Sequence, residues 1–272
     1  MGAIGFLLVV VHVLPVIFTF VEFDGRPGAF YGLFTTNVFG SGLCRNAGFY
    51  DEPGALACWG VYALLYNKLF IGNKKIEKLL LVGLISTLSL AYFIQVTVYF
   101  FLFYRKKRVK SLVLFSSIFL LLKGIASIDE TYNSAIFGRM EYDESTGKFN
   151  GDNRIDQVDL SLAIFKESPV YGVGASNLSK YAGDEFIGSN IFGSWAADGL
   201  LGQIILYSPL FYILFLGARD RKYVYAVIVL AFGFYQRPYG AVYIINVVSL
   251  FVMAMYSYLD INKNEKYFSN IN

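Results

Sequence analysis

Apolar runs of about 20 residues recur along this chain and limit what it can fold into. A helix rises ~1.5 Å per residue, so about 20 apolar residues cross the ~30 Å hydrocarbon layer of a bilayer. The composition agrees, because 56% of the residues are apolar and only 16% are charged, against about 25% charged residues in average soluble domains. We therefore predict an all-α fold, a polytopic integral membrane helix bundle in a single transmembrane domain covering residues 1–272.

The hydrophobic runs predict six spans and one interrupted pair of helices. The six spans are 2–21, 54–71, 111–127, 191–217, 223–235 and 239–258. The remaining run, 79–104, has basic links at both ends, so a single crossing would leave one of them outside. Its stretch STLSLAYF (86–93) favours a broken or re-entrant pair of short helices with both ends in the cytoplasm.

The charges between the runs predict the sidedness. The cluster RKKRVK (105–110) has five positive charges and no negative one, which is typical of a cytoplasmic loop. Residues 128–189 hold eleven Asp or Glu against five Lys or Arg, a net charge of minus six. We expect 128–190 to form a large extracytoplasmic loop that contains a short amphipathic helix at 155–165. Both termini are then cytoplasmic.

Five arginines fall on the predicted outer side, and one of them, Arg26, lies in GRPG, which is typical of a solvated turn. The other four run against the trend of the remaining loops: Arg45, Arg139, Arg154 and Arg237. A guanidinium group presents a planar fork of donors that matches phosphate oxygens. Several arginines converging at a bilayer surface indicate a site for a lipid diphosphate. The alternative, which stays open, is that each arginine pairs with a nearby acid, as Arg45 could with Glu52.

Four sequence elements carry a family resemblance. They are RNAGFYDEPGALA (45–57), STLSLAY (86–92), Arg139 followed by NRIDQVDLSLAIFKESPVYGVGASN (153–177), and SNIFGSWAADGLLGQI (189–204). In this order they resemble the elements of bacterial O-antigen polymerases, in the polysaccharide polymerase branch of the O-antigen ligase-like superfamily. Ser189 stands where the related ligases carry a histidine, which favours the polymerase branch. Members usually carry more spans, so the resemblance also implies that N-terminal helices are missing.

The resemblance implies an enzyme, a metal-independent glycosyltransferase without a cofactor. It would join oligosaccharide repeat units linked to polyprenyl diphosphate into surface polysaccharide (O-antigen of lipopolysaccharide, capsule or exopolysaccharide). The reaction would take place at the outer face of the bacterial inner (cytoplasmic) membrane. The implied partners are the polyprenyl-diphosphate-linked oligosaccharide, membrane lipid, and a chain-length regulator and flippase of the same pathway, with no nucleic acid. The alternatives are ligase-like transfer of glycan to an acceptor, a non-enzymatic transporter component, and an inactive truncated remnant.

The candidate site residues follow from this chemistry. Fixed positive charges on a diphosphate leaving group stabilise the transition state, and a carboxylate can accept the acceptor's proton. The candidate catalytic residues are Glu52, Arg139, Arg154 and Asp156. The candidate substrate-binding residues are Arg45, Asn190, Arg237, Gly172 and Gly174. The two glycines also suit a tight turn after the loop helix, and no spacing of metal ligands is evident.

Overall fold

The computed structural model of the 272-residue chain is mostly helical, as predicted. It describes residues 16–21, 27–31, 35–38, 44–50, 53–104, seven single positions between 109 and 124, 142–144, 148–149, 154–182, 190, 192–236 and 243–269. The chain divides into two compact units. Unit 1 comprises 1–67 with 73–152, and unit 2 comprises 68–72 with 153–272.

Unit 1 contains a four-stranded antiparallel sheet that the sequence did not predict. Its strands follow one another in chain order as β1 (Phe18–Val21), β2 (Pro27–Phe30), β3 (Thr35–Val38) and β4 (Cys44–Gly48). A small hairpin of β5 (Tyr142–Asp143) and β6 (Lys148–Phe149) lies further along the chain. The prediction of an all-α fold is therefore wrong in excluding strands.

The sheet also corrects the first predicted span. The last four residues of 2–21 form β1 and pair with β2, and the Phe18 and Phe30 rings lie 4.9 Å apart between their centroids. Aromatic and β-branched residues such as these pack well across paired strands, which hydropathy alone does not register. Residues 1–15 lie outside the described residues.

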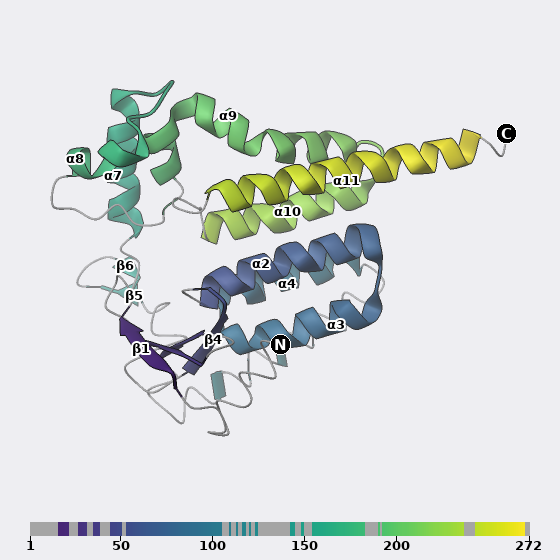
Figure 1. Ribbon diagram of the computed structural model, residues 1–272, viewed down its shortest axis with the longest axis horizontal. Helices are drawn as coiled ribbons and strands as arrows, with labels where there is room; N and C mark the ends of the chain where they lie inside the picture. The colour runs from purple at the N-terminus through teal and green to yellow at the C-terminus, as the bar shows by residue number, and fades with distance from the viewer. Residues whose placement is uncertain are drawn as a thin grey trace. The chain divides into compact units, whose positions relative to one another are not determined.

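Among the elements that the structure describes in unit 1 are three helices that run back and forth beside one another (Figure 1). They are α2 (Pro53–Tyr66), continued by a π-helical turn (Asn67–Ile71), α3 (Lys74–Gly83), and α4 (Leu90–Phe103). Gly60 lets the turn between α3 and α4 pack on α2, because a Cβ there would lie 2.3 Å from the Leu84 side chain in that turn.

Helices α3 and α4 form an antiparallel hairpin that covers the run 79–104 and begins slightly before it, at Lys74. A 3₁₀ turn, η2 (Leu84–Thr87), and Leu88 in the left-handed conformation interrupt the run. This interruption overlaps the start of the stretch 86–93 where the sequence predicts a break. At the open end, the hydroxyl groups of Tyr99 and Tyr104 both donate to Glu77. Both ends of the hairpin therefore lie together, whereas their side of the membrane stays a prediction.

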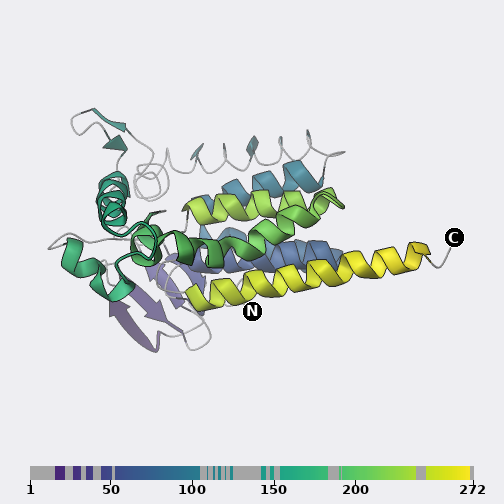
Figure 2. The same ribbon diagram turned by 90° about the horizontal axis from the view of Figure 1, so that it is seen from above.

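Unit 2 begins with α7 (Arg154–Glu167), which contains the predicted loop helix, and a turn, η6 (Ala175–Asn177), leads to α8 (Leu178–Ala182). Three long helices follow, α9 (Gly193–Leu216), α10 (Arg221–Gln236) and α11 (Tyr243–Ser269). Figure 2 shows these three lying side by side, with α9 in contact with both others. The inner face of α7 carries the buried Ser161 and Ile164 and packs on α9.

Two of the described helices are long and apolar enough to cross a membrane: Pro53–Ile71 and Gly193–Leu216. They cover most of the predicted spans 54–71 and 191–217. Helix α10 contains the predicted 223–235, and α11 begins later than 239 and runs beyond 258. The predicted span 111–127 lies largely outside the described residues.

Candidate functional site

The break between η2 and α4 is held by two side chains of β4. Arg45 Nε donates to the Thr87 carbonyl oxygen at 2.8 Å, and Arg45 Nη2 donates to the Leu88 carbonyl oxygen at 3.3 Å. Asn46 Nδ2 donates to Ser86 Oγ at 3.0 Å. Carbonyl groups at the end of a helical turn lack partners within it and carry partial negative charge, so a cation is favourable there. The guanidinium group of Arg45 thus supports the break.

The hydroxyl residues of STLS also bond to their own backbone. Ser86 Oγ donates to the Gly83 carbonyl at 2.7 Å, and Thr87 Oγ1 donates to the Leu84 carbonyl at 2.7 Å. Such local bonds compete with a continuous helix. They explain why a short hydroxyl-rich stretch interrupts an apolar run. Arg45 has a structural role at this break, and a binding role for it stays a prediction.

A second break lies inside α9, at Gly199, where φ is 61° and ψ is −171°. The sequence predicts 191–217 as one uninterrupted span and does not indicate this break. Backbone groups of the loop after α7 form hydrogen bonds with α9 at this break. The N–H groups of Val173 and Gly174 donate to the Ala196 and Ala197 carbonyls at 2.9 and 2.8 Å.

The same loop also accepts hydrogen bonds from the part of α9 that follows the break. The N–H groups of Leu200 and Leu201 donate to the Pro169 and Val170 carbonyls at 2.9 and 3.1 Å. The groups left unpaired by the break are therefore bonded on both sides of it. We call this arrangement of 169–174 with 196–201 the backbone clasp.

Two glycines make the backbone clasp possible. A Cβ on Gly172 would lie 2.2 Å from the Ala197 carbonyl oxygen, and a Cβ on Gly199 would lie 2.4 Å from the Gly172 nitrogen. Both have a positive φ, 71° at Gly172 and 61° at Gly199. Only a residue without a side chain allows two backbone segments to approach this closely.

The clasp also involves Gly172 and Gly174, which the sequence suggests as candidate substrate-binding residues. The Gly172 N–H donates to the Ser168 carbonyl at 2.8 Å, and the Gly174 N–H donates to Ala197 as described. Because these donors are already bonded to protein, they are not free to surround a phosphate. Gly172 and Gly174 form the tight turn that the sequence allows as their other role.

Asn190, predicted to bind substrate, connects α7 to the start of α9. Its Nδ2 donates to Ser161 Oγ at 3.0 Å, and its Oδ1 accepts from the Phe192 N–H at 2.9 Å. Trp195 packs edge-on against Phe165 of α7, with 6.0 Å between ring centroids. These contacts hold α7 against the first half of α9, and a substrate contact for Asn190 stays a prediction.

For the remaining candidate residues, the structure describes no side-chain positions. Arg154 is the first residue of α7, and Asp156 lies in the same first turn. The other three, Glu52, Arg139 and Arg237, lie outside the described residues. The convergence of the arginines therefore stays a prediction.

Sequence reasoning missed three polar residues beside the break in α9: Ser194, Asp198 and Gln203. Ser194 Oγ donates to Gln203 Oε1 at 3.3 Å. Within the described ranges, Gln203 Nε2 is buried without a hydrogen-bond partner, and Asp198 has no hydrogen bond or ion pair. A single acid inside the apolar run 191–217 was the available signal, because ionisable residues in such runs are costly unless they serve a purpose.

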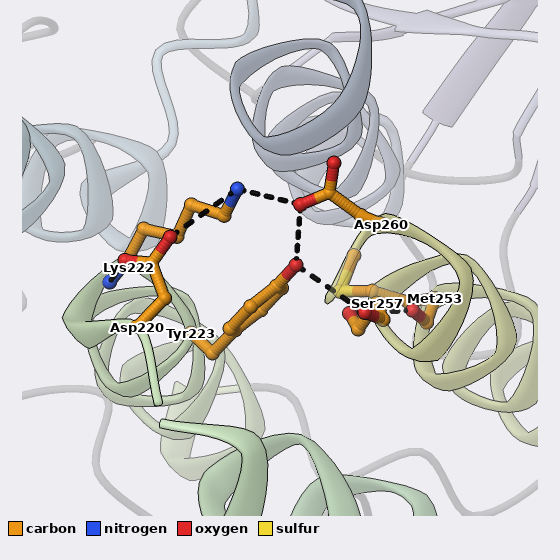
Figure 3. A network of polar contacts seen from close by, with 6 residues as sticks. All are labelled: Asp220, Lys222, Tyr223, Met253, Ser257 and Asp260. Atoms are coloured by element: carbon orange, nitrogen blue, oxygen red, sulfur yellow. Dashed lines mark hydrogen bonds and ion pairs between the residues drawn. The ribbon is translucent and has the colours of Figure 1, made fainter. Parts of the chain in front are cut away.

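A charged cluster joins the start of α10 to α11 (Figure 3). Lys222 Nζ lies 2.7 Å from Asp260 Oδ2 and 3.4 Å from Asp220 Oδ2, and the Tyr223 hydroxyl donates to Asp260 at 2.7 Å. Burial alone would raise the pKa of Asp260, but the hydrogen bonds from Lys222 and Tyr223 and the charges of Lys222 and Lys263 outweigh it and lower that pKa. These pairings give the cluster a structural role.

Comparison of the chain with protein-family models, with curated proteins and with solved structures finds no match. Among the side chains that the structure describes, no group of three or more His, Cys, Asp and Glu could hold a metal ion. The function is therefore argued from the two interrupted helices and their polar residues.

Proposed function

We propose that this protein polymerises oligosaccharide repeat units carried on polyprenyl diphosphate, by glycosyl transfer at the outer face of a bacterial inner membrane. In this proposal the chain is a multi-pass membrane protein. Exposed apolar side chains on α9 support contact of this helix with lipid. Among them are Ile204, Ile205, Phe211 and Phe215.

The observation that carries the proposal is the pairing of the four sequence elements. Arg45 and Asn46 of the first element bond to Ser86, Thr87 and Leu88 of the second. The loop of the third element forms the backbone clasp with the fourth. The four elements thus meet in two pairs, each at a helix break, and this arrangement supports a shared role for them.

In this proposal, arginines bind the diphosphate of the glycosyl donor. The diphosphate gains negative charge as its bond to the sugar breaks, so a guanidinium beside it stabilises the transition state more than the ground state. Arg154 heads α7, and the positive end of a helix dipole also favours an anion. Arg139 and Arg237 are the further arginines of this proposal, and Glu52 or Asp156 would take the acceptor's proton.

Expression in a bacterial strain deleted for its own polymerase tests the proposal. Surface glycan separated by gel electrophoresis should change from single repeat units to long polymer when the chain is present. Arg154→Ala should abolish the polymer, whereas Lys166→Ala, which removes an exposed cation from the other end of the same helix, should not. Single repeat units with or without the protein would overturn the proposal.

Broken apolar helices also line solute paths in transporters, which makes a transporter component the second candidate function. The deletion strain separates the two. A transporter would leave the repeat units unjoined and change only the amount that reaches the surface, while a polymerase would change their length distribution.

A further inference from the structure

The break at Gly199 brings three polar side chains to one face of an apolar helix. Ser194 and Asp198 are four residues apart in the half of α9 before the break, so they lie on the same face. Ser194 Oγ contacts Gln203 Oε1, although positions nine apart in an unbroken helix would be about 13 Å apart along its axis. The turn at Gly199 thus brings the Gln203 amide to the face that carries Asp198.

This face holds one donor and one acceptor that lack partners. The Gln203 side chain is 3% exposed, and its Nε2 has no hydrogen-bond partner among the described residues. The Asp198 carboxylate is half-buried and is unpaired in the same part of the chain. Gly202 leaves room for it, because a Cβ there would lie 2.3 Å from the Asp198 Cβ. Unpaired buried polar groups are costly, so the Gln203 amide indicates a partner that the described residues do not supply.

The two groups together select the chemistry of that partner. A metal cation would be repelled by the free N–H groups of Gln203, whose oxygen already accepts from Ser194. An anion would be repelled by Asp198. A neutral hydroxyl can accept from the amide and donate to the carboxylate at once, and sugars carry many such groups.

We infer that Ser194, Asp198 and Gln203 form the site for the acceptor sugar hydroxyl, with Asp198 as the base; this inference rests on the proposed function. The hydroxyl proton passes to an Asp198 carboxylate oxygen as the hydroxyl oxygen forms a bond to the anomeric carbon of the donor sugar. The bond from that carbon to the diphosphate oxygen breaks, and its electron pair leaves with polyprenyl diphosphate. Asp198 then releases the proton to water. Gln203 orients the hydroxyl, and Ser194 orients Gln203.

The test uses the purified full chain in lipid nanodiscs, with lipid-linked repeat units extracted from the polymerase-deleted strain as donor and acceptor. We expect Asp198→Asn to slow chain extension about 100-fold or more, the usual contribution of a general base. The wild-type rate should fall at low pH as the carboxylate is protonated. That fall should disappear in Asp198→Asn and return in Asp198→Glu. Asp159→Asn removes an exposed carboxylate from α7 and should leave the rate and its pH profile unchanged.

Gln203→Met keeps the volume of the side chain and removes its amide, so it should raise the KM for the acceptor about tenfold with a smaller effect on kcat. In a Trp59→Phe background, Trp195 fluorescence reports whether each variant is folded. If the wild type extends chains, and Asp198→Asn keeps both the rate and its fall at low pH, the inference about Asp198 is overturned while the proposed function stands. If wild type extends nothing, the proposed function fails with it. Should Asp198→Asn unfold, an unchanged acceptor KM in Gln203→Met overturns the inference.

Discussion

Each of the two units contains an interrupted apolar helix, and different groups form the hydrogen bonds at the two breaks. In unit 1 the guanidinium of Arg45 bonds to the carbonyls at the break. In unit 2 the break in α9 is bonded by backbone groups of the 169–174 loop. A side chain adds charge and tolerates small shifts of its long stem, whereas a backbone clasp requires glycine at the point of closest approach. The first break should therefore depend on charge, and the second on the absence of a Cβ.

The chain offers a separate probe for each break. It contains two tryptophans, Trp59 in α2 of unit 1 and Trp195 in α9 of unit 2. Replacing one of them by phenylalanine leaves the other as the only indole fluorophore. Denaturant unfolding in detergent can then be followed in one unit at a time.

The largest effect is expected at the clasp. Gly172→Ala places a Cβ against the Ala197 backbone at a positive φ, and should lower the free energy of unfolding of unit 2 by about 3 kcal/mol or more. Gly72→Ala is the matched control, because Gly72 also has a positive φ but no atom within 4 Å of the added Cβ. It should cost about 1 kcal/mol from backbone strain alone. Equal losses for the two variants would contradict the clasp.

The next effect is expected at Arg45. Arg45→Ala leaves the Thr87 and Leu88 carbonyls without their donor and should lower the free energy of unfolding of unit 1, followed by Trp59, by about 2 to 3 kcal/mol. Arg45→Lys should restore part of this loss, since an ammonium keeps the charge without the planar fork. Lys75→Ala, at an exposed position of α3, should change it by less than about 0.5 kcal/mol. If Trp195 reported the larger loss, the assignment of Arg45 to the first break would be wrong.

The smallest effect is expected at the charged cluster of α10 and α11. A carboxyl whose pKa is lowered by folding adds stability above its ordinary pKa, and loses it as the pH falls toward the folded value. For Asp260 the ordinary pKa is 3.8, so unit 2 should lose stability as the pH falls below about 4. Asp260→Asn should remove this part of the loss when Trp195 unfolding is compared at pH 6 and pH 3. An identical loss in the variant would show that other groups cause it.

Local patterns were enough to predict the first break and the turn that packs against the second, but not the second break itself. The hydroxyl residues at 86–89 indicate an interruption because their side chains bond to their own backbone. Gly172 and Gly174 indicate a turn because glycine readily adopts a positive φ, and both do so in the structure. The partners of these segments could not be predicted. Thr87 lies 42 residues from Arg45, and no local pattern at Gly199 distinguishes a break from an ordinary glycine in an apolar helix.

The sequence by itself determined that the chain is mostly helical, that a hydroxyl-rich stretch interrupts one apolar run, and which charges cluster between runs. These properties depend on neighbouring residues and on their preference for water or hydrocarbon. Only the tertiary structure decided that Arg45 supports the first break, that Gly172 and Gly199 meet in the second, and that Gln203 reaches the face of Asp198. Those contacts join residues apart in the sequence, and backbone approach and hydrogen-bond geometry in the folded chain select them.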